Sequence, residues 1–119
     1  MSYIGRQLNV PASTIQLTAD GAISAGDPVV IKSSGDAAKV DSTDASLTSE
    51  NFIGFAENDC TDNGLATIQL GGSVNDKQTS LTAGQTYFVQ TDGTIGTPAD
   101  SPSVTAGTAV SATEILVKG

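Results

Sequence analysis

The sequence predicts an all-β protein, a single small β-barrel or β-sandwich that follows an extended N-terminal arm. Two observations carry this prediction. Short runs of β-branched and aromatic residues alternate with Gly, Asn, Asp and Ser turns about every ten positions, a spacing typical of sandwiches and barrels. The chain also repeats a strand-and-turn segment. No stretch has the periodicity of a helix of normal length, and only residues 47–51 could form a single helical turn.

The repeated segment is ISAGDPVVIKSSGD at 23–36, and its second copy is LTAGQTYFVQTDGT at 81–94. In each copy an Ala-Gly turn precedes a short apolar strand, and a second glycine turn follows the strand. Looser correspondences follow along the chain, between 53–56 and 106–109 and between 67–70 and 114–117.

Two copies are too few for a repeat array, in which each unit needs neighbours to bury its apolar face. We therefore predict two halves of one fold, about 14–72 and 73–119, related by a pseudo-twofold and closed or nearly closed into one barrel. With residues 1–13 as the arm, residues 14–119 form one domain of ordinary size.

Five strands are predicted in the first half. Residues 14–19 alternate polar and apolar side chains, which places Ile15 and Leu17 on one face of a half-buried strand. Three adjacent apolar residues in the strand 27–33 indicate burial on both faces, and Pro28 belongs at its start or on an edge because proline lacks an amide donor. The remaining strands are 37–40, 51–56 and 65–70, with acidic loops at 41–50 and 57–64.

Within the strand 51–56, Gly54 indicates a bulge or a close approach of another backbone. A polar connection, 71–80, leads into the second half. The loop 97–103 contains two prolines and is therefore not regular structure. The strands predicted in the second half are 86–91, 106–110 and 114–117.

The predicted core is thin. Apolar residues make up 38% of the chain and are mostly small, with three Phe, two Tyr and no Trp. A domain with so little apolar volume gains stability from partner subunits, so we expect a homotrimer that completes apolar area between its subunits.

The chain is acidic, with a formal net charge of −8. Its five basic residues are scattered: Arg6, Lys32, Lys39, Lys77 and Lys118. Nucleic-acid binding requires a clustered positive surface that displaces counterions from phosphates. Because an acidic surface is repelled by DNA and by anionic membranes, we expect neither a nucleic-acid nor a membrane partner.

Cys60 is the only cysteine, so no intramolecular disulfide is possible and nothing supports a secreted, disulfide-rich scaffold. The opening MSYIGRQ has no hydrophobic signal core, and no apolar run approaches the roughly 18 residues of a membrane span. We therefore expect synthesis in a cytoplasm.

No catalytic, metal or cofactor site is predicted. Histidine, the most frequent general base and metal ligand, is absent, and Cys60 has no basic neighbour in sequence to activate it. The loop 57–64 offers oxygen ligands for calcium but lacks the spacing of a known calcium loop, which favours a solvated turn. The glycine pairs precede no helix that could bind phosphate, and carboxylate pairs lack the aromatic platforms of glycosidases. The residues favour a binding or structural module over an enzyme.

The N-terminal segment is the candidate partner-binding site. It contains four apolar residues and the only arginine of the chain: Tyr3, Ile4, Leu8, Val10 and Arg6. One interpretation is a frayed terminus. The other is an arm that orders against a neighbouring subunit, where an arginine is well suited to a bidentate pair with a carboxylate.

The repeat and the ending LTAGQTYFVQTDGTIGT…SVTAGTAVSATEILVKG resemble virion proteins of tailed phages. Segments of the type GLTAGQxYYVQxDGTL…AGxAxSATxLLV occur in head decoration (capsid cement) proteins and in tail-fibre β-modules. The resemblance is strong over 53–119 and looser over 23–40, and SYIGR at 2–6 is similar to the short N-terminal arms of phage fibre proteins. These motifs mark a structural module and carry no catalytic residues.

The resemblance implies a decoration protein that binds the outer surface of the phage head, stabilises the shell and contacts the major capsid protein, as a trimer. Residues 1–10 would then cross onto a second copy or onto the major capsid protein. The alternative is a tail-fibre or adhesin module that attaches to a receptor or to the virion. A fibre would extend far beyond one domain, and this chain has no shaft sequence, so we favour decoration.

Overall fold

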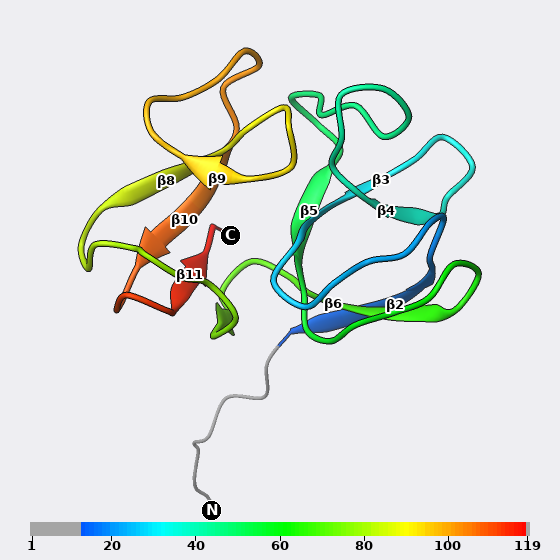
Figure 1. Ribbon diagram of the computed structural model, residues 1–119, viewed down its shortest axis with the longest axis horizontal. Helices are drawn as coiled ribbons and strands as arrows, with labels where there is room; N and C mark the ends of the chain where they lie inside the picture. Colours follow the sequence, from blue (N-terminus) through cyan, green and yellow to red (C-terminus); the bar gives the residue numbers. More distant parts are fainter. Residues whose placement is uncertain (1–12, 119) are drawn as a thin grey trace, which may run out of the picture.

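Two five-stranded antiparallel sheets make up residues 13–118, the part of the chain that the computed structural model describes (Figure 1). In sheet order, the first contains β2 (Thr14–Thr18), β6 (Leu65–Gln69), β5 (Phe52–Ala56), β3 (Pro28–Ile31) and β4 (Ala37–Lys39). The second contains β7 (Val74–Asn75), β11 (Ile115–Val117), β10 (Thr105–Ala109), β8 (Thr86–Val89) and β9 (Ile95–Gly96). The predicted all-β fold is confirmed.

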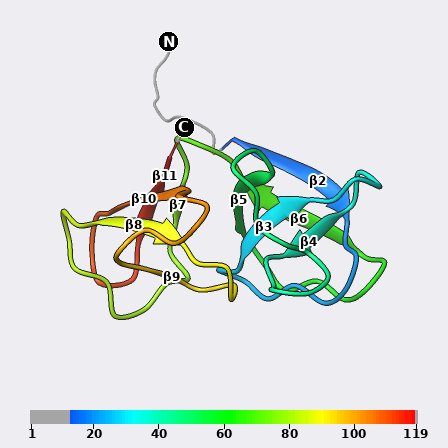
Figure 2. The ribbon, with the colours of Figure 1, turned by 90° about the horizontal axis from the view of Figure 1, so that it is seen from above.

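Each sheet is built from one half of the chain, and seen from above the two halves lie side by side (Figure 2). Of the two predicted architectures, the β-sandwich fits these separate sheets. Among the described residues, no strand of one half pairs with a strand of the other, so no single barrel closes across both halves. A parallel bridge between Ala19 and Ala37 instead brings the end of β2 back to β4, which curls the first half around its own core.

The two sheets have the same internal order. When the strands of each half are counted along the chain, the first strand lies at one edge of the sheet. The fifth, fourth, second and third strands follow it across the sheet. Turn hydrogen bonds also match, because Gly26 N donates to Ala56 O (2.9 Å) and its counterpart Gly84 N donates to Ala109 O (2.8 Å). This order supports the sequence alignment of the two copies, while their relation by a pseudo-twofold stays a prediction.

Gly54 and Gly107 occupy the same place in the two halves. Their φ angles are 155° and 158°, and a Cβ atom on either would collide with a backbone carbonyl, that of Gln69 or that of Leu116. The ladder beside each glycine shifts register, next to Val29 in the first sheet and next to Tyr87 in the second. The bulge and close approach predicted at Gly54 are therefore present, and the second half repeats them.

Two apolar clusters form the core. One lies within the first half and includes Ile23, Val29 and Ile68. The other spans both halves and is made by residues whose side chains lose nearly all exposure: Val30, Ala38, Val40, Ala45, Leu47, Phe55, Val89, Ala106, Ile115 and Val117. Neighbouring Val29 and Val30 thus enter different clusters, which confirms that this strand is buried on both faces.

A buried amide network also joins the halves. Asn75, which is fully buried, donates through Nδ2 to Ala56 O (3.1 Å) and to Gln69 Oε1 (2.8 Å). Gln78 Nε2 donates to Gly26 O and to Asn75 Oδ1, each at 2.9 Å. These bonds fix the edge strand β7 of the second half against the first sheet.

The predicted acidic loop after β4 is held by its own carboxylates. Asp41 Oδ1 accepts the backbone N–H groups of Thr43, Asp44 and Ala45 at 2.6–3.0 Å, and these bonds lower the pKa of Asp41 to about 2. Lys32 Nζ lies between Asp20 (2.7 Å) and Asp44 (3.3 Å), and the hydrogen bond to Asp20 is the main reason that the pKa of Lys32 is raised. The loop therefore seats Ala45 and Leu47 in the shared core.

Candidate interaction surface

The predicted partner-binding residues, Tyr3, Ile4, Arg6, Leu8 and Val10, lie outside the described residues. The point where their segment joins the domain is described. The carbonyl oxygen of Ser13 accepts hydrogen bonds from Leu70 N (2.9 Å) and from Ser73 Oγ (3.0 Å). Ser13, the first described residue, is therefore bonded to the turn that connects the two halves.

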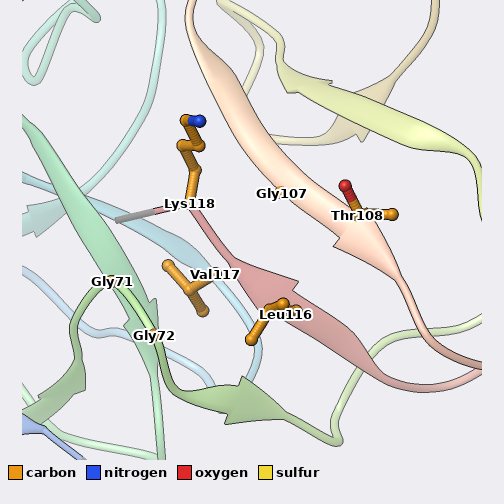
Figure 3. Close-up of a pocket in the computed structure, with 7 residues that line it drawn as sticks. All are labelled: Gly71, Gly72, Gly107, Thr108, Leu116, Val117 and Lys118. Atoms are coloured by element: carbon orange, nitrogen blue, oxygen red, sulfur yellow. The ribbon is translucent and has the colours of Figure 1, made fainter.

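A surface groove of about 390 Å³ begins at the same turn (Figure 3). It is lined by residues of that turn, of β10 and of β11: Gly71, Gly72, Gly107, Thr108, Leu116, Val117 and Lys118. Gly72 N donates to Val117 O at 3.0 Å, which closes the turn onto the end of β11. Gly72 is exposed, and a Cβ atom on it would meet nothing within 4 Å, so a partner side chain can approach the backbone of this turn closely.

A short row of exposed side chains, two of them apolar, crosses one face of the second sheet beside the groove. Leu116 stands directly opposite Thr108 on β10 and Val74 on β7, so the three side chains point to one face. Leu116 and Val74 are each 42% exposed. The sequence pattern predicted the strand 114–117 but not this row, because Leu116 sits between the buried Ile115 and Val117 in an unbroken apolar run.

The acidic loop 57–64 uses its carboxylates to hold the fold. Asp59 Oδ1 accepts Ala25 N and Asp62 Oδ1 accepts Gly21 N, both at 2.8 Å. Throughout residues 13–118 there is no group of three or more His, Cys, Asp or Glu side chains arranged to hold a metal ion. Cys60 is half-buried, and its backbone pairs with Ile23 in a short bridge. This loop therefore closes the core of the first half.

Comparison with models of known protein families finds no match for this chain, and comparison with curated proteins finds none either. The resemblance to phage virion proteins accordingly stays a prediction from sequence motifs. Within the described range, 13–118, no helix is long and apolar enough to cross a membrane.

Proposed function

We propose that the chain is a capsid decoration protein that binds the outer surface of a tailed-phage head as a trimer and stabilises the shell. The observation that carries this proposal is the resemblance of residues 53–119 to virion structural proteins. Three further features support it: a small all-β domain, a net charge of −8, and a surface groove at the turn to which Ser13 is bonded. None of these features requires an enzyme activity or a cofactor.

The stabilisation is mechanical. A shell filled with DNA fails where its subunits separate, and a protein that bridges neighbouring subunits raises the free energy of that separation. Because such a protein binds the intact shell and not the separated subunits, its binding free energy adds to the stability of the shell. The acidic surface suits the outside of a particle, since it is repelled by any exposed DNA.

The N-terminal segment is the contact that we assign to the major capsid protein. Its apolar residues Tyr3, Ile4, Leu8 and Val10 supply area that is buried on binding, and Arg6 supplies a bidentate partner for a carboxylate. Residues from Ile15 onward belong to the folded domain, because β2 already pairs with β6 along its whole length.

The test is binding of purified protein to heads that lack it, measured by co-sedimentation and electron microscopy. Deletion of residues 2–10 should leave a folded domain with an unchanged circular dichroism spectrum and at least about tenfold weaker binding, the effect of losing about 1.4 kcal/mol. Replacing Arg6 with Lys keeps the charge but removes the planar fork, so this matched variant should bind with intermediate affinity.

Unchanged binding by the truncated protein would refute the role of the N-terminal segment. Protein density on tails with none on heads would refute decoration and favour the tail-fibre or adhesin alternative.

A further inference from the structure

The two halves of the chain contact each other through different surfaces. The first half contributes what we call the covered face, which includes Gly26, Phe55 and Gln69. Its residues lie beneath the second half: Phe55 is fully buried, Gln69 is 8% exposed, and a Cβ atom on Gly26 would lie 2.7 Å from the carbonyl oxygen of Lys77. The second half contributes the covering edge, Asn75 and Gly93, which are both buried against the first half.

The repeat assigns a counterpart to each of these residues. The counterparts of Gly26, Phe55 and Gln69 are Gly84, Thr108 and Leu116, because the copies align in sequence and in hydrogen bonding. All three are exposed, and a Cβ atom on Gly84 would meet nothing within 4 Å. The second half thus carries the same face as the first, and no described residue covers it. We call it the open face.

The covering edge of the second half also has a counterpart in the first half, and this counterpart packs against no described part of the second half. Ile15 pairs with Ile68 on β6 as Asn75 pairs with the corresponding Ile115 on β11, so Ile15 is the counterpart of Asn75. Ile15 is 38% exposed, whereas Asn75 is fully buried. The counterpart of Gly93 is Gly35, and it meets nothing within 4 Å, whereas a Cβ on Gly93 would collide with Val40 O. Ile15 and Gly35 form the open edge.

The internal contact and the open surfaces carry different kinds of residue at corresponding positions. Inside the molecule, the covering edge meets the covered face through a hydrogen bond between two amides, from Asn75 Nδ2 to Gln69 Oε1 at 2.8 Å. At the same positions the open edge carries Ile15 and the open face carries Leu116. A pair of amides is thus replaced by a pair of large apolar side chains, both exposed. Single exposed apolar side chains are common on protein surfaces, so what indicates a partner here is the match in position: Ile15 and Leu116 stand at the two positions that meet inside the molecule.

We propose that a second copy of this chain binds head to tail, with the open edge of one copy, at Ile15, seated on the open face of the next, at Leu116. The contact between copies then repeats the contact between halves. Such a contact is heterologous, so it joins copies into a closed ring or, if the rotation does not close, into a filament. A ring of three copies would present six halves in succession around its axis. This proposal rests on the repeat and the burial pattern and does not depend on the shell as the target.

The test uses two variants, one that disrupts the open face and one that disrupts the open edge. Leu116→Asp places a charge on the open face, and Ile15→Asp places one on the open edge. The matched control is Leu65→Asp, because Leu65 is 61% exposed and lies on the opposite face of its sheet from Ile15. Molar mass is measured by light scattering and sedimentation, and folding is checked by circular dichroism.

The wild-type chain and Leu65→Asp should both self-associate. Each of the other two variants should be monomeric, with a dissociation constant raised at least about thirtyfold, the effect of truncating an interface hot spot. An equimolar mixture of Leu116→Asp and Ile15→Asp should form dimers and nothing larger, because one intact edge and one intact face remain to meet. If an aspartate variant does not fold, Leu116→Gln or Ile15→Asn replaces it, and each should also lose association, because an amide does not supply the apolar burial that this contact requires.

Three results would overturn the proposal. The first is a wild-type chain that stays monomeric up to about 1 mM, where a contact would be worth only about 4 kcal/mol. The second is a mixture of the two variants that remains monomeric, which would show that the two surfaces do not meet. The third is loss of association when residues 2–10 are deleted, which would assign the open face to the N-terminal segment. Each of these results would overturn the contact between copies only. Decoration itself is decided separately, by the particle-binding assay.

Discussion

Replacing Asn75 with alanine removes the side chain through which β7 is bonded to the first sheet. The side chain makes four hydrogen bonds. Nδ2 donates to Ala56 O and Gln69 Oε1, while Oδ1 accepts from Lys77 N (3.1 Å) and Gln78 Nε2 (2.9 Å). The substitution therefore removes one partner from two acceptors and two donors, although Ala56 O keeps its hydrogen bond from Gly26 N at 2.9 Å.

The burial of these partners sets the magnitude. Gln69 is 8% exposed, so its Oε1 becomes a nearly buried acceptor without a donor, whereas Ala56 O still accepts Gly26 N. An orphaned buried acceptor costs about 1–3 kcal/mol, and the donors of exposed Lys77 and half-buried Gln78 can bond to water. We expect the free energy of unfolding to fall by about 2 kcal/mol, a substantial part of the roughly 5–15 kcal/mol of a typical domain.

Urea denaturation followed by circular dichroism measures this change. With a slope of about 2 kcal/mol/M, the midpoint should fall by about 1 M. Gln16→Ala is the matched control, because Gln16 is an exposed amide with one long hydrogen bond to Thr67 (3.3 Å), and its effect should stay within about 0.5 kcal/mol. Equal midpoints for Asn75→Ala and Gln16→Ala would refute the buried network as a link between the halves.

Two further predictions follow from the fold. Gly54→Ala should destabilise the domain by more than about 3 kcal/mol because its Cβ collides with the backbone of Gln69, whereas Gly84→Ala, with a φ of 86° but open space, should cost about 1 kcal/mol; equal midpoints in urea would contradict this. The folded-state pKa of Asp41, about 2, lies below its ordinary 3.8, so its ionisation stabilises the fold fully above pH 3.8, and this contribution is lost as the pH falls through about 2. Carbon NMR titration of the Asp41 carboxyl group measures this pKa directly, and a value near 3.8 would show that the loop bonds are not formed.

The strands that the sequence predicted are those in which side chains alternate or form an apolar run over several residues. β2, β3 and β10 all lie within two residues of their predicted ranges. The sequence pattern missed β7 and β9, which have two residues each. Asn75 lies in a segment of turn-forming residues, and it is a strand residue only because β11 pairs with it and the first sheet buries it. Such pairing depends on residues far along the chain and leaves no local period.

The candidate surface was harder to predict for the same reason. Composition pointed to Tyr3, Ile4, Leu8 and Val10 because they are apolar in a segment with no fold of its own. Nothing local to Leu116 distinguishes it from its buried neighbours, and its exposure depends on which face of the sheet the other half covers. One signal was present in the sequence: alignment of the two copies places Leu116 at the position of Gln69, an exchange that two equivalent environments would not favour.

The chemistry of the two contacts follows from how each is formed. The halves of one chain are held together by the connection through Gly71 and Gly72, so their effective concentration is high and their contact needs little intrinsic affinity. A polar pair such as Gln69 and Asn75 suffices there, since it fixes geometry more than it adds affinity. Separate copies must first lose translational and rotational freedom, which costs at least about 4 kcal/mol. Leu116 and Ile15 are 42% and 38% exposed, so completing their burial contributes a part of the about 1.5–3 kcal/mol that such a side chain gains on full burial, a gain that amides in water do not supply. Apolar residues at the open positions are therefore what a contact between copies requires, and amides at the covered positions are what a contact within one chain permits.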